Sequence, residues 1–227
     1  MSDYQAVLFD LDGTLIDTAQ DMGLALNLLL RHHQRPGFDD HELRPLVSHG
    51  SAALINFGFN VKESDEQFID LRDQFLAIYE QNIAVNSCLF EGMESILQQL
   101  EYSDIPWGIV TNKPGKYTNL LLAELSLDKR ASTVISGDTL ALRKPNPEPL
   151  LAACEQIECT PEKCLYVGDA LRDIQAARAA GMTACVAIYG YYMDHENPTE
   201  WNPDFYIKEP LELNKHINFN NQIGNTV

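Results

Sequence analysis

Short apolar runs, each followed at once by a small or polar residue, constrain the fold of this chain more than any other feature. Segments long enough for helices lie between most of them. Apolar strands separated in this way are typical of a parallel sheet that helices cover on both faces. From residue 89 onward the pattern therefore predicts an α/β fold, a doubly wound parallel sheet of Rossmann-like type. The runs are Ala6–Phe9, Trp107–Val110, Thr133–Ile135, Cys164–Val167 and Thr183–Ile188.

The segment between the first two runs is different, because its apolar residues follow helical spacing. Leu24 and Leu28 lie one turn apart, and a second stripe runs from Phe68 to Tyr79 at intervals of three and four residues. Ser64-Asp65-Glu66 precedes this second stripe and is expected to cap a helix. The expected domains are a core of residues 1–15 and 88–227 and an inserted α-helical cap domain of residues 16–87.

The strongly negative net charge of the chain argues against two classes of binding partner. It carries 16 basic and 33 acidic residues, which gives a net charge of −17. Such an excess repels nucleic-acid backbones and anionic lipid, so we expect neither nucleic acid nor membrane as a partner. An anionic substrate would need a local cation to overcome this field. No secretory leader or stretch of about 20 apolar residues is visible, which predicts a cytoplasmic protein.

The five cysteines give no sign of a disulfide framework or a zinc site. Their number is odd and no C-x-x-C pair occurs. The even spacing of Cys154, Cys159 and Cys164 invites a metal interpretation, but it does not match zinc-ligand spacing. We expect buried, reduced thiols.

The motif Asp10-Leu11-Asp12-Gly13-Thr14 directly follows the first predicted strand. In extended geometry Asp10 and Asp12 point to the same side, and Gly13 allows a sharp turn that brings N–H groups toward a ligand. Two carboxylates so close repel each other unless a cation lies between them or one is protonated. The alternative is an ordinary Asp-Gly turn at the end of a strand.

A second acidic motif follows a later strand. Asp169 comes directly after Gly168, and Asp173 lies one helical turn further on. Taken alone, these acids could simply cap a helix and favour its dipole. Ligands of open parallel sheets, however, bind at the carboxyl ends of the strands, where all of these acids converge. Carboxylates from separate strands suit Mg²⁺.

Three further residues have the chemistry to bind a phosphoryl group. Thr111 and Asn112 end the second core strand and offer a hydroxyl and a neighbouring N–H. Lys144 stands before a predicted helix and offers a point charge. Each alone has a plain structural explanation, as a strand-end cap or a solvated surface charge.

Together the motifs D-x-D-G-T, T-N, K-P and G-D-x-x-x-D, in this order, resemble the haloacid dehalogenase superfamily, specifically phosphohydrolases with a helical cap after the first strand. The resemblance covers the chain from Val7 to about Leu213. It implies that Asp10 is the nucleophile that forms an aspartyl-phosphate. It implies that Asp12 protonates the leaving oxygen and then activates water. The implied Mg²⁺ ligands are Asp10, the Asp12 carbonyl, Asp169 and, in support, Asp173; the implied phosphoryl-binding residues are Thr111, Asn112 and Lys144.

Details of the motifs favour phosphatase activity within this superfamily. Dehalogenases lack the second aspartate, and ion-pumping ATPases have Lys-Thr in place of Leu11-Asp12. Residues 165–182 resemble phosphoglycolate phosphatase-like enzymes, whereas Tyr189-Gly190-Tyr191 and Trp201 also resemble bacterial N-acetylmuramic acid 6-phosphate phosphatases. A β-phosphoglucomutase shares the core motifs. A receiver-like phosphoaccepting signalling module is a further alternative, but receiver domains contain neither the G-D-x-x-x-D motif nor a helical insertion after the first strand.

The resemblance places substrate choice in the cap, in the loop from Arg44 to Ser51. Arg44 is its only Arg or Lys, and we expect it to pair with a carboxylate on the substrate. Ser48 and His49 are the other candidates for contact with the leaving group. The alternative is an ordinary turn between two helices. The expected partner is a small phosphomonoester, and the sequence leaves monomer and homodimer both open.

Overall fold

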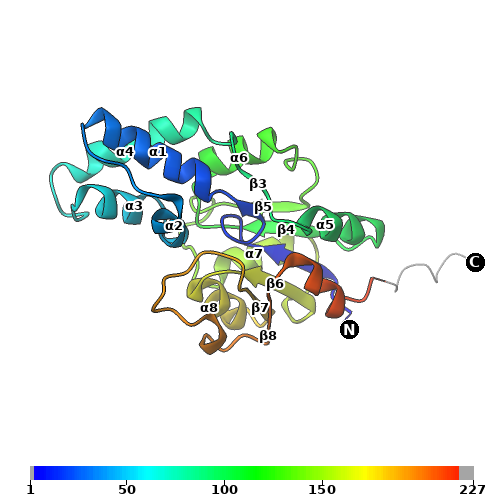
Figure 1. The fold of residues 1–227 in the computed structure, drawn as a ribbon. Coiled ribbons are helices and arrows are strands. Elements are labelled where there is room, and N and C mark those ends of the chain that lie inside the picture. The colour runs from blue at the N-terminus through cyan, green and yellow to red at the C-terminus, as the bar shows by residue number, and fades with distance from the viewer. Residues whose placement is uncertain (1–2, 220–227) are drawn as a thin grey trace, which may run out of the picture.

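A six-stranded parallel sheet forms the centre of the computed structural model, which describes residues 3–219 (Figure 1). Its strands are β1 (Ala6–Phe9), β4 (Trp107–Val110), β5 (Thr133–Ile135), β6 (Cys164–Gly168), β7 (Thr183–Ala187) and β8 (Phe205–Ile207). They lie in the order β5-β4-β1-β6-β7-β8, and every neighbouring pair is parallel. The predicted doubly wound α/β fold is confirmed. Because β1 lies between β4 and β6, its carboxyl end is in the middle of the sheet.

Helices cover both faces of this sheet. Side chains of a strand alternate between its two faces, and β1 follows this rule. Val7 and Phe9 belong to one hydrophobic cluster with residues of α5 and α6, and Ala6 and Leu8 belong to a second cluster with residues of α7 and α8. All four β1 side chains are fully buried. The helices are α5 (Met93–Tyr102), α6 (Gly115–Glu124), α7 (Glu148–Gln156) and α8 (Leu171–Ala179).

The segment after β1 forms a separate group of helices beside the sheet (Figure 1). These are α1 (Ala19–His32), α2 (Asp40–Leu43), the 3₁₀ helix η1 (Arg44–His49), α3 (Gly50–Phe59) and α4 (Phe68–Gln81). Two short antiparallel strands, β2 (Ile16–Asp17) and β3 (Cys88–Leu89), carry the chain out to these helices and back. We call the helices α1 to α4 with η1 the cap. The boundaries expected for a cap domain lie next to β2 and β3.

A buried carboxylate holds the two connections of the cap together. Asp21, in the first turn of α1, is fully buried. Its oxygens accept hydrogen bonds from the backbone N–H groups of Asn86 and Ser87 and from both of their side chains, at 2.7 to 3.0 Å. The start of α1 is thereby fixed to the chain that returns to the core.

Two expectations about local structure are wrong. Ser64-Asp65-Glu66 does not cap α4, because Asp65 accepts instead from the backbone N–H of Lys62 at 2.8 Å and the N-cap position is Gln67. The pattern of apolar runs also did not predict β2, β3 or β8, which have only two or three residues each. The two residues of β2 and of β3 are too few to show any periodicity.

The cysteines are five free thiols. Cys154, Cys164 and Cys185 are buried as expected, but Cys88 is exposed on the short strand β3 and Cys159 is half-buried. Within residues 3–219, no group of side chains with a spacing suited to a metal contains cysteine. No helix in this part of the chain is both long and apolar enough to cross a membrane.

Candidate active site

Asp10 and Lys144 form a buried ion pair at the carboxyl end of β1. Asp10 Oδ1 lies 2.9 Å from Lys144 Nζ, and the same ammonium lies 2.8 Å from Asp173 Oδ1. It also donates to the carbonyl oxygen of Val110 at 2.8 Å. Burial opposes ionisation of Asp10, but the charges of Lys144 and Arg172 outweigh it and lower its pKa. Asp10 is therefore ionised at neutral pH.

Three aspartates form a buried acidic cluster. Carboxylate oxygens of Asp10, Asp169 and Asp173 all lie within 4.8 Å of one another. Burial, and then the charges of Asp10 and Asp173, raise the pKa of Asp169 to about 7. Burial also raises the pKa of Asp173, against the opposing charge of Lys144. A divalent cation would relieve this repulsion, and carboxylate oxygens are ligands that Mg²⁺ prefers. The three side chains therefore fit a magnesium ion.

Asp12 is held by a different set of partners. Its Oδ1 accepts from the Thr18 hydroxyl at 2.7 Å and from Lys113 Nζ at 2.9 Å. Lys113 also donates to the hydroxyl of Tyr79, in α4 of the cap, at 2.9 Å. The Asp12 side chain is not part of the acidic cluster. The metal contact that the resemblance implies for Asp12 is through its backbone carbonyl, and this contact stays a prediction. Lys113 was not predicted as a site residue, although its position directly after Thr111-Asn112 at the end of a strand is a usable signal in the sequence.

The predicted phosphoryl-binding residues gather around Asp10. Thr111 and Asn112 follow β4 and line the same cavity as Asp10. The Thr111 hydroxyl accepts from the Lys113 N–H at 3.2 Å, and Asn112 Nδ2 donates to the Lys144 carbonyl at 2.9 Å. Asn112 Oδ1 is buried and has no hydrogen-bond partner among the described residues. The structure thus brings Thr111, Asn112 and Lys144 to one place.

Ser48 and His49 bring the cap to this site. The Ser48 hydroxyl donates to Asp169 Oδ2 at 2.8 Å, and Arg172 donates to the Ser48 carbonyl at 2.9 Å. Both Ser48 and His49 line the cavity. Burial lowers the pKa of His49, although Glu196 Oε2 lies 3.9 Å from its Nε2. His49 is therefore mainly neutral at pH 7.

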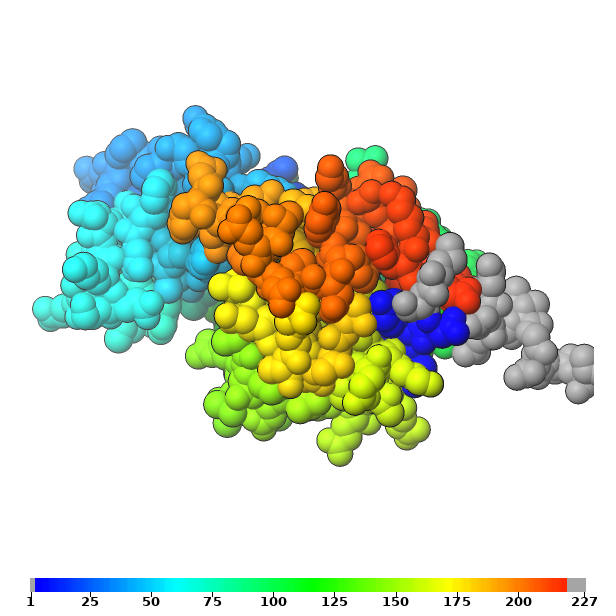
Figure 2. All heavy atoms as spheres, turned by 90° about the horizontal axis from the view of Figure 1, so that it is seen from below, coloured from blue at the N-terminus to red at the C-terminus, as the bar shows by residue number. Residues whose placement is uncertain are grey.

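Arg44 is not brought to the cavity. It is absent from the cavity wall, and its Nη1 lies 2.8 and 3.0 Å from the two carboxylate oxygens of Asp17 in β2. Its guanidinium carbon lies 4.7 Å from the centre of the Tyr191 ring, and the Tyr191 hydroxyl donates to Asp17. Figure 2 shows the segment after β7, in orange, against the blue and cyan cap. The expected contact between Arg44 and a leaving group is not supported, because its charge is already paired at the connection of cap and core.

Gly13 lets the first motif approach the acidic cluster closely. Its φ is +85°, and a Cβ built on it would lie only 2.2 Å from Asp169 Oδ2. The neighbouring Thr14 hydroxyl donates to Asp169 Oδ1 at 3.0 Å, and the Tyr191 N–H donates to Asp169 Oδ2 at 2.9 Å. A side chain at position 13 would displace Asp169, which explains the glycine.

A cavity of about 700 Å³ lies between the core and the cap. The core contributes Asp10 and Asp12 to its wall, and α4 contributes much of the opposite side. The wall carries four Arg and Lys residues against the three carboxylates of Asp10, Asp12 and Glu63, so its charge is close to balanced although the chain has a net charge of −17. Its Arg and Lys residues are Arg72, Lys113, Arg143 and Arg172. None of these four was predicted, although two of them directly precede the predicted Lys144 and Asp173.

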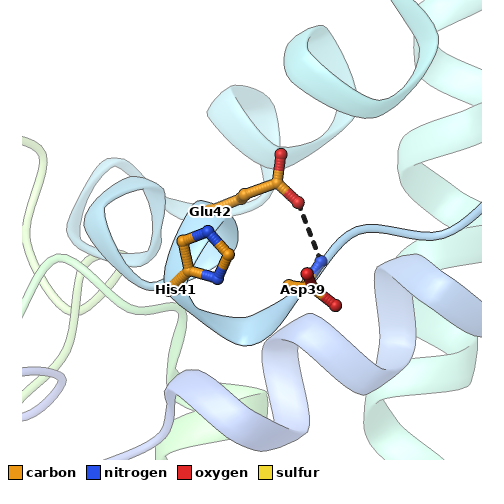
Figure 3. A group of neighbouring side chains, drawn as sticks. All are labelled: Asp39, His41 and Glu42. Atoms are coloured by element: carbon orange, nitrogen blue, oxygen red, sulfur yellow. Dashed lines mark hydrogen bonds between the residues drawn. The ribbon is translucent and has the colours of Figure 1, made fainter.

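A second group with metal-like spacing lies on the exposed surface of the cap (Figure 3). It consists of Asp39, His41 and Glu42 at the start of α2. Glu42 Oε2 accepts from the Asp39 N–H at 2.9 Å, which fixes the first turn of this short helix. The group is explained by helix capping.

The fold and the strand-end aspartates define a hydrolase of the capped α/β class. A model of the family described as haloacid dehalogenase-like hydrolase matches residues 7–187. The chain belongs to this family.

Proteins that resemble this chain carry the names of phosphatases. The chain is 39% identical over 213 residues to the N-acetylmuramic acid 6-phosphate phosphatase of Pseudomonas putida, which covers 94% of this chain and 96% of that protein. It is 43% identical over 209 residues to a phosphoglycolate phosphatase of Xanthomonas campestris, covering 92% and 94%. A crystal structure described as a predicted phosphoglycolate phosphatase from Haemophilus somnus superposes with a TM-score of 0.84 at 26% identity, covering 95% of this chain and 99% of that one. The chain is a phosphatase of this family.

Proposed function

We propose that the protein is a Mg²⁺-dependent phosphomonoesterase that acts through an aspartyl-phosphate on Asp10. The observation that carries this proposal is the ionised Asp10, which is paired with Lys144 and lies in the same buried cluster as Asp169 and Asp173. A carboxylate nucleophile must be ionised and must have a cation nearby to accept an anionic phosphoryl group. Both conditions are met at this position.

The proposed reaction has two steps. In the first, an Asp10 oxygen bonds to phosphorus while the bond from phosphorus to the leaving oxygen breaks. Asp12, an ion-paired carboxylate in the free protein, would take up a proton from solvent as the substrate binds and give it to that oxygen. In the second, Asp12 accepts a proton from a water molecule that attacks phosphorus, and the bond to Asp10 breaks. Thr111, Asn112 and Lys144 would hold the oxygens of the phosphoryl group.

Asp10, Asp169 and Asp173, together with the Asp12 carbonyl, would hold the magnesium ion. When bound, the ion would neutralise the carboxylates and the phosphoryl oxygens. The helices of residues 16–87 would exclude water from the cavity when they close over a substrate. The five free thiols fit a reducing compartment, and we place the protein in the cytoplasm.

For the substrate we propose a phosphate ester of a carboxylic acid. Phosphoglycolate and N-acetylmuramic acid 6-phosphate, the compounds in the names of the two relatives above, both fit this description. Phosphoglycolate is favoured by residues 165–182, which resemble those of phosphoglycolate phosphatase-like enzymes. The sugar phosphate is favoured by the size of the cavity, about 700 Å³, which falls in the ~300–1,000 Å³ range of sites for much larger ligands than glycolate.

A screen of phosphate release from a panel of phosphomonoesters, with and without Mg²⁺, tests this function. We expect release that needs Mg²⁺ and that Asp10→Asn abolishes. Phosphate release at the wild-type rate in excess chelator, or by Asp10→Asn, would contradict the proposal.

A further inference from the structure

Helix α4 presents one continuous face to the cavity. The residues of this face recur at intervals of three or four, as residues on one side of a helix do. They are Phe68, Arg72, Phe75, Leu76 and Tyr79. Arg72 is the only charged residue among them, and it has aromatic neighbours one turn before and one turn after it.

The guanidinium of Arg72 has hydrogen-bonding capacity that the protein leaves unused. Within residues 3–219 its Nε is shielded from solvent and has no hydrogen-bond partner, whereas the side chain as a whole is 41% exposed and so can be reached from the cavity. Its Nη2 lies 3.5 Å from Asp73 Oδ1, well beyond the ~2.7–2.9 Å of a charge-assisted bond. By contrast, Lys113 is paired with Asp12 and Arg172 donates to Ser48. A shielded Nε–H without a partner costs stability, so this N–H on a side chain that lines the cavity points to a partner that arrives with the ligand.

The position of Arg72 fixes which part of a substrate it meets. The phosphoryl group must lie against Asp10, on the core side of the cavity. The leaving group then extends toward α4 on the cap side. A two-carbon leaving group would leave most of the cavity to water, whereas a sugar ring would fill more of it and contact Phe68 and Phe75. A carboxylate on such a ring would supply the planar acceptor that a guanidinium binds with two parallel hydrogen bonds.

We propose that Arg72 is a specificity-determining residue that pairs with a carboxylate on a sugar-sized leaving group, with the apolar face of α4 holding the ring. This inference rests on the proposed phosphomonoesterase function. It places recognition of the second anionic group on α4 rather than on Arg44 in η1.

A matched pair of substrates isolates the carboxylate. N-acetylmuramic acid 6-phosphate and N-acetylglucosamine 6-phosphate differ only in the lactyl ether that carries this group. The experiment measures kcat/KM for both compounds with wild type, Arg72→Gln, Arg72→Lys and the control Arg31→Gln. Arg31 is an exposed residue of α1 that does not line the cavity, so its replacement changes the charge of the cap by the same amount.

We expect wild type to prefer the muramic acid compound, and Arg72→Gln to reduce that preference by about 10- to 150-fold, the effect of one charge-assisted contact. Arg72→Lys keeps the positive charge but cannot form the two parallel hydrogen bonds of a guanidinium, so it should retain part of the preference. Arg31→Gln should keep the wild-type ratio. A ratio that Arg72→Gln leaves unchanged, or a wild type that hydrolyses phosphoglycolate far better than either sugar phosphate, would overturn the inference.

Binding to the inactive Asp10→Asn protein separates this inference from the proposed function. Calorimetry gives Kd for both sugar phosphates, with and without Arg72→Gln. Suppose that Asp10→Asn binds the muramic acid compound more tightly, that this preference in Kd depends on Arg72, and that wild type releases no phosphate. This result would support the subsite and reject the phosphatase proposal. Phosphate release without any such preference in Kd would support the phosphatase and reject the subsite.

Discussion

Lys113 and Asp12 form an ion pair in which neither side chain has much contact with solvent. Nζ lies 2.9 Å from Oδ1, and the side chains are only 6% and 16% exposed. The same ammonium donates to the Tyr79 hydroxyl on the cap, and burial, partly offset by the Lys113 charge, raises the pKa of Tyr79 to about 12. One core lysine therefore connects the proposed acid and base to the cap.

We expect Lys113→Met to be strongly destabilising, because it leaves the Asp12 carboxylate in a nearly buried place without its cation. Removing one partner of a buried pair costs about 3–5 kcal/mol. Tyr79→Phe keeps the ion pair and removes one acceptor, so it should cost about 1 kcal/mol. Urea unfolding followed by circular dichroism measures both. Similar unfolding midpoints for Lys113→Met and wild type would show that the pair contributes nothing to stability.

The nucleophile is tested most directly by Asp10→Asn. The amide cannot form the aspartyl-phosphate, so kcat should fall by about 10⁴-fold or more, as is typical when one member of a catalytic unit is lost. Rapid quenching of wild type with a labelled phosphomonoester should trap label on the protein, and the variant should trap none. Label that Asp10→Asn still acquires would place the nucleophile elsewhere.

The sequence predicted what depends on local patterns and missed what depends on contacts between distant segments. The strands β1, β4 and β6 could be located because each is a continuous apolar run with a polar residue at its end. The acidic cluster could be predicted because parallel strands bring their carboxyl ends to one edge. Arg44 was misplaced because nothing local shows that Asp17, 27 residues earlier, takes its charge. Arg72 was overlooked because an arginine within an amphipathic helix resembles any solvated charge.

The acidic cluster predicts a pH dependence of stability in the metal-free protein. The pKa of Asp169 is about 7 in the folded protein, against 3.8 for an unperturbed aspartate. Between these values the folded state binds more protons than the unfolded state, so this group's contribution to stability falls as pH rises from about 4 to 7. In chelator, Asp169→Asn should therefore gain Tm relative to wild type between pH 5 and pH 8.

Magnesium should reverse this loss, because a cation binds the ionised carboxylates and only the folded state holds them together. We expect Mg²⁺ to raise the Tm of wild type more at pH 8 than at pH 5, and to raise that of Asp169→Asn much less. Thermal melts at both pH values, with chelator or Mg²⁺, provide the measurement. An increase of the same size in wild type and Asp169→Asn would show that Asp169 does not hold the ion.

Replacement of Arg44 should affect all substrates alike, in contrast to that of Arg72. The Arg44–Asp17 pair is 37% and 25% exposed and joins η1 to β2, away from the cavity wall. A partly exposed pair contributes about 0.2–1 kcal/mol, so Arg44→Ala should lower kcat/KM by no more than a few-fold on both sugar phosphates and on p-nitrophenyl phosphate. Asp17→Asn also weakens the hydrogen bond from the Tyr191 hydroxyl, and the double variant should lose little more than Asp17→Asn alone, since the contact with Arg44 is then already gone. A loss confined to the carboxylate-bearing compound would return substrate recognition to Arg44 and show that the cap rearranges to bring its guanidinium into the cavity.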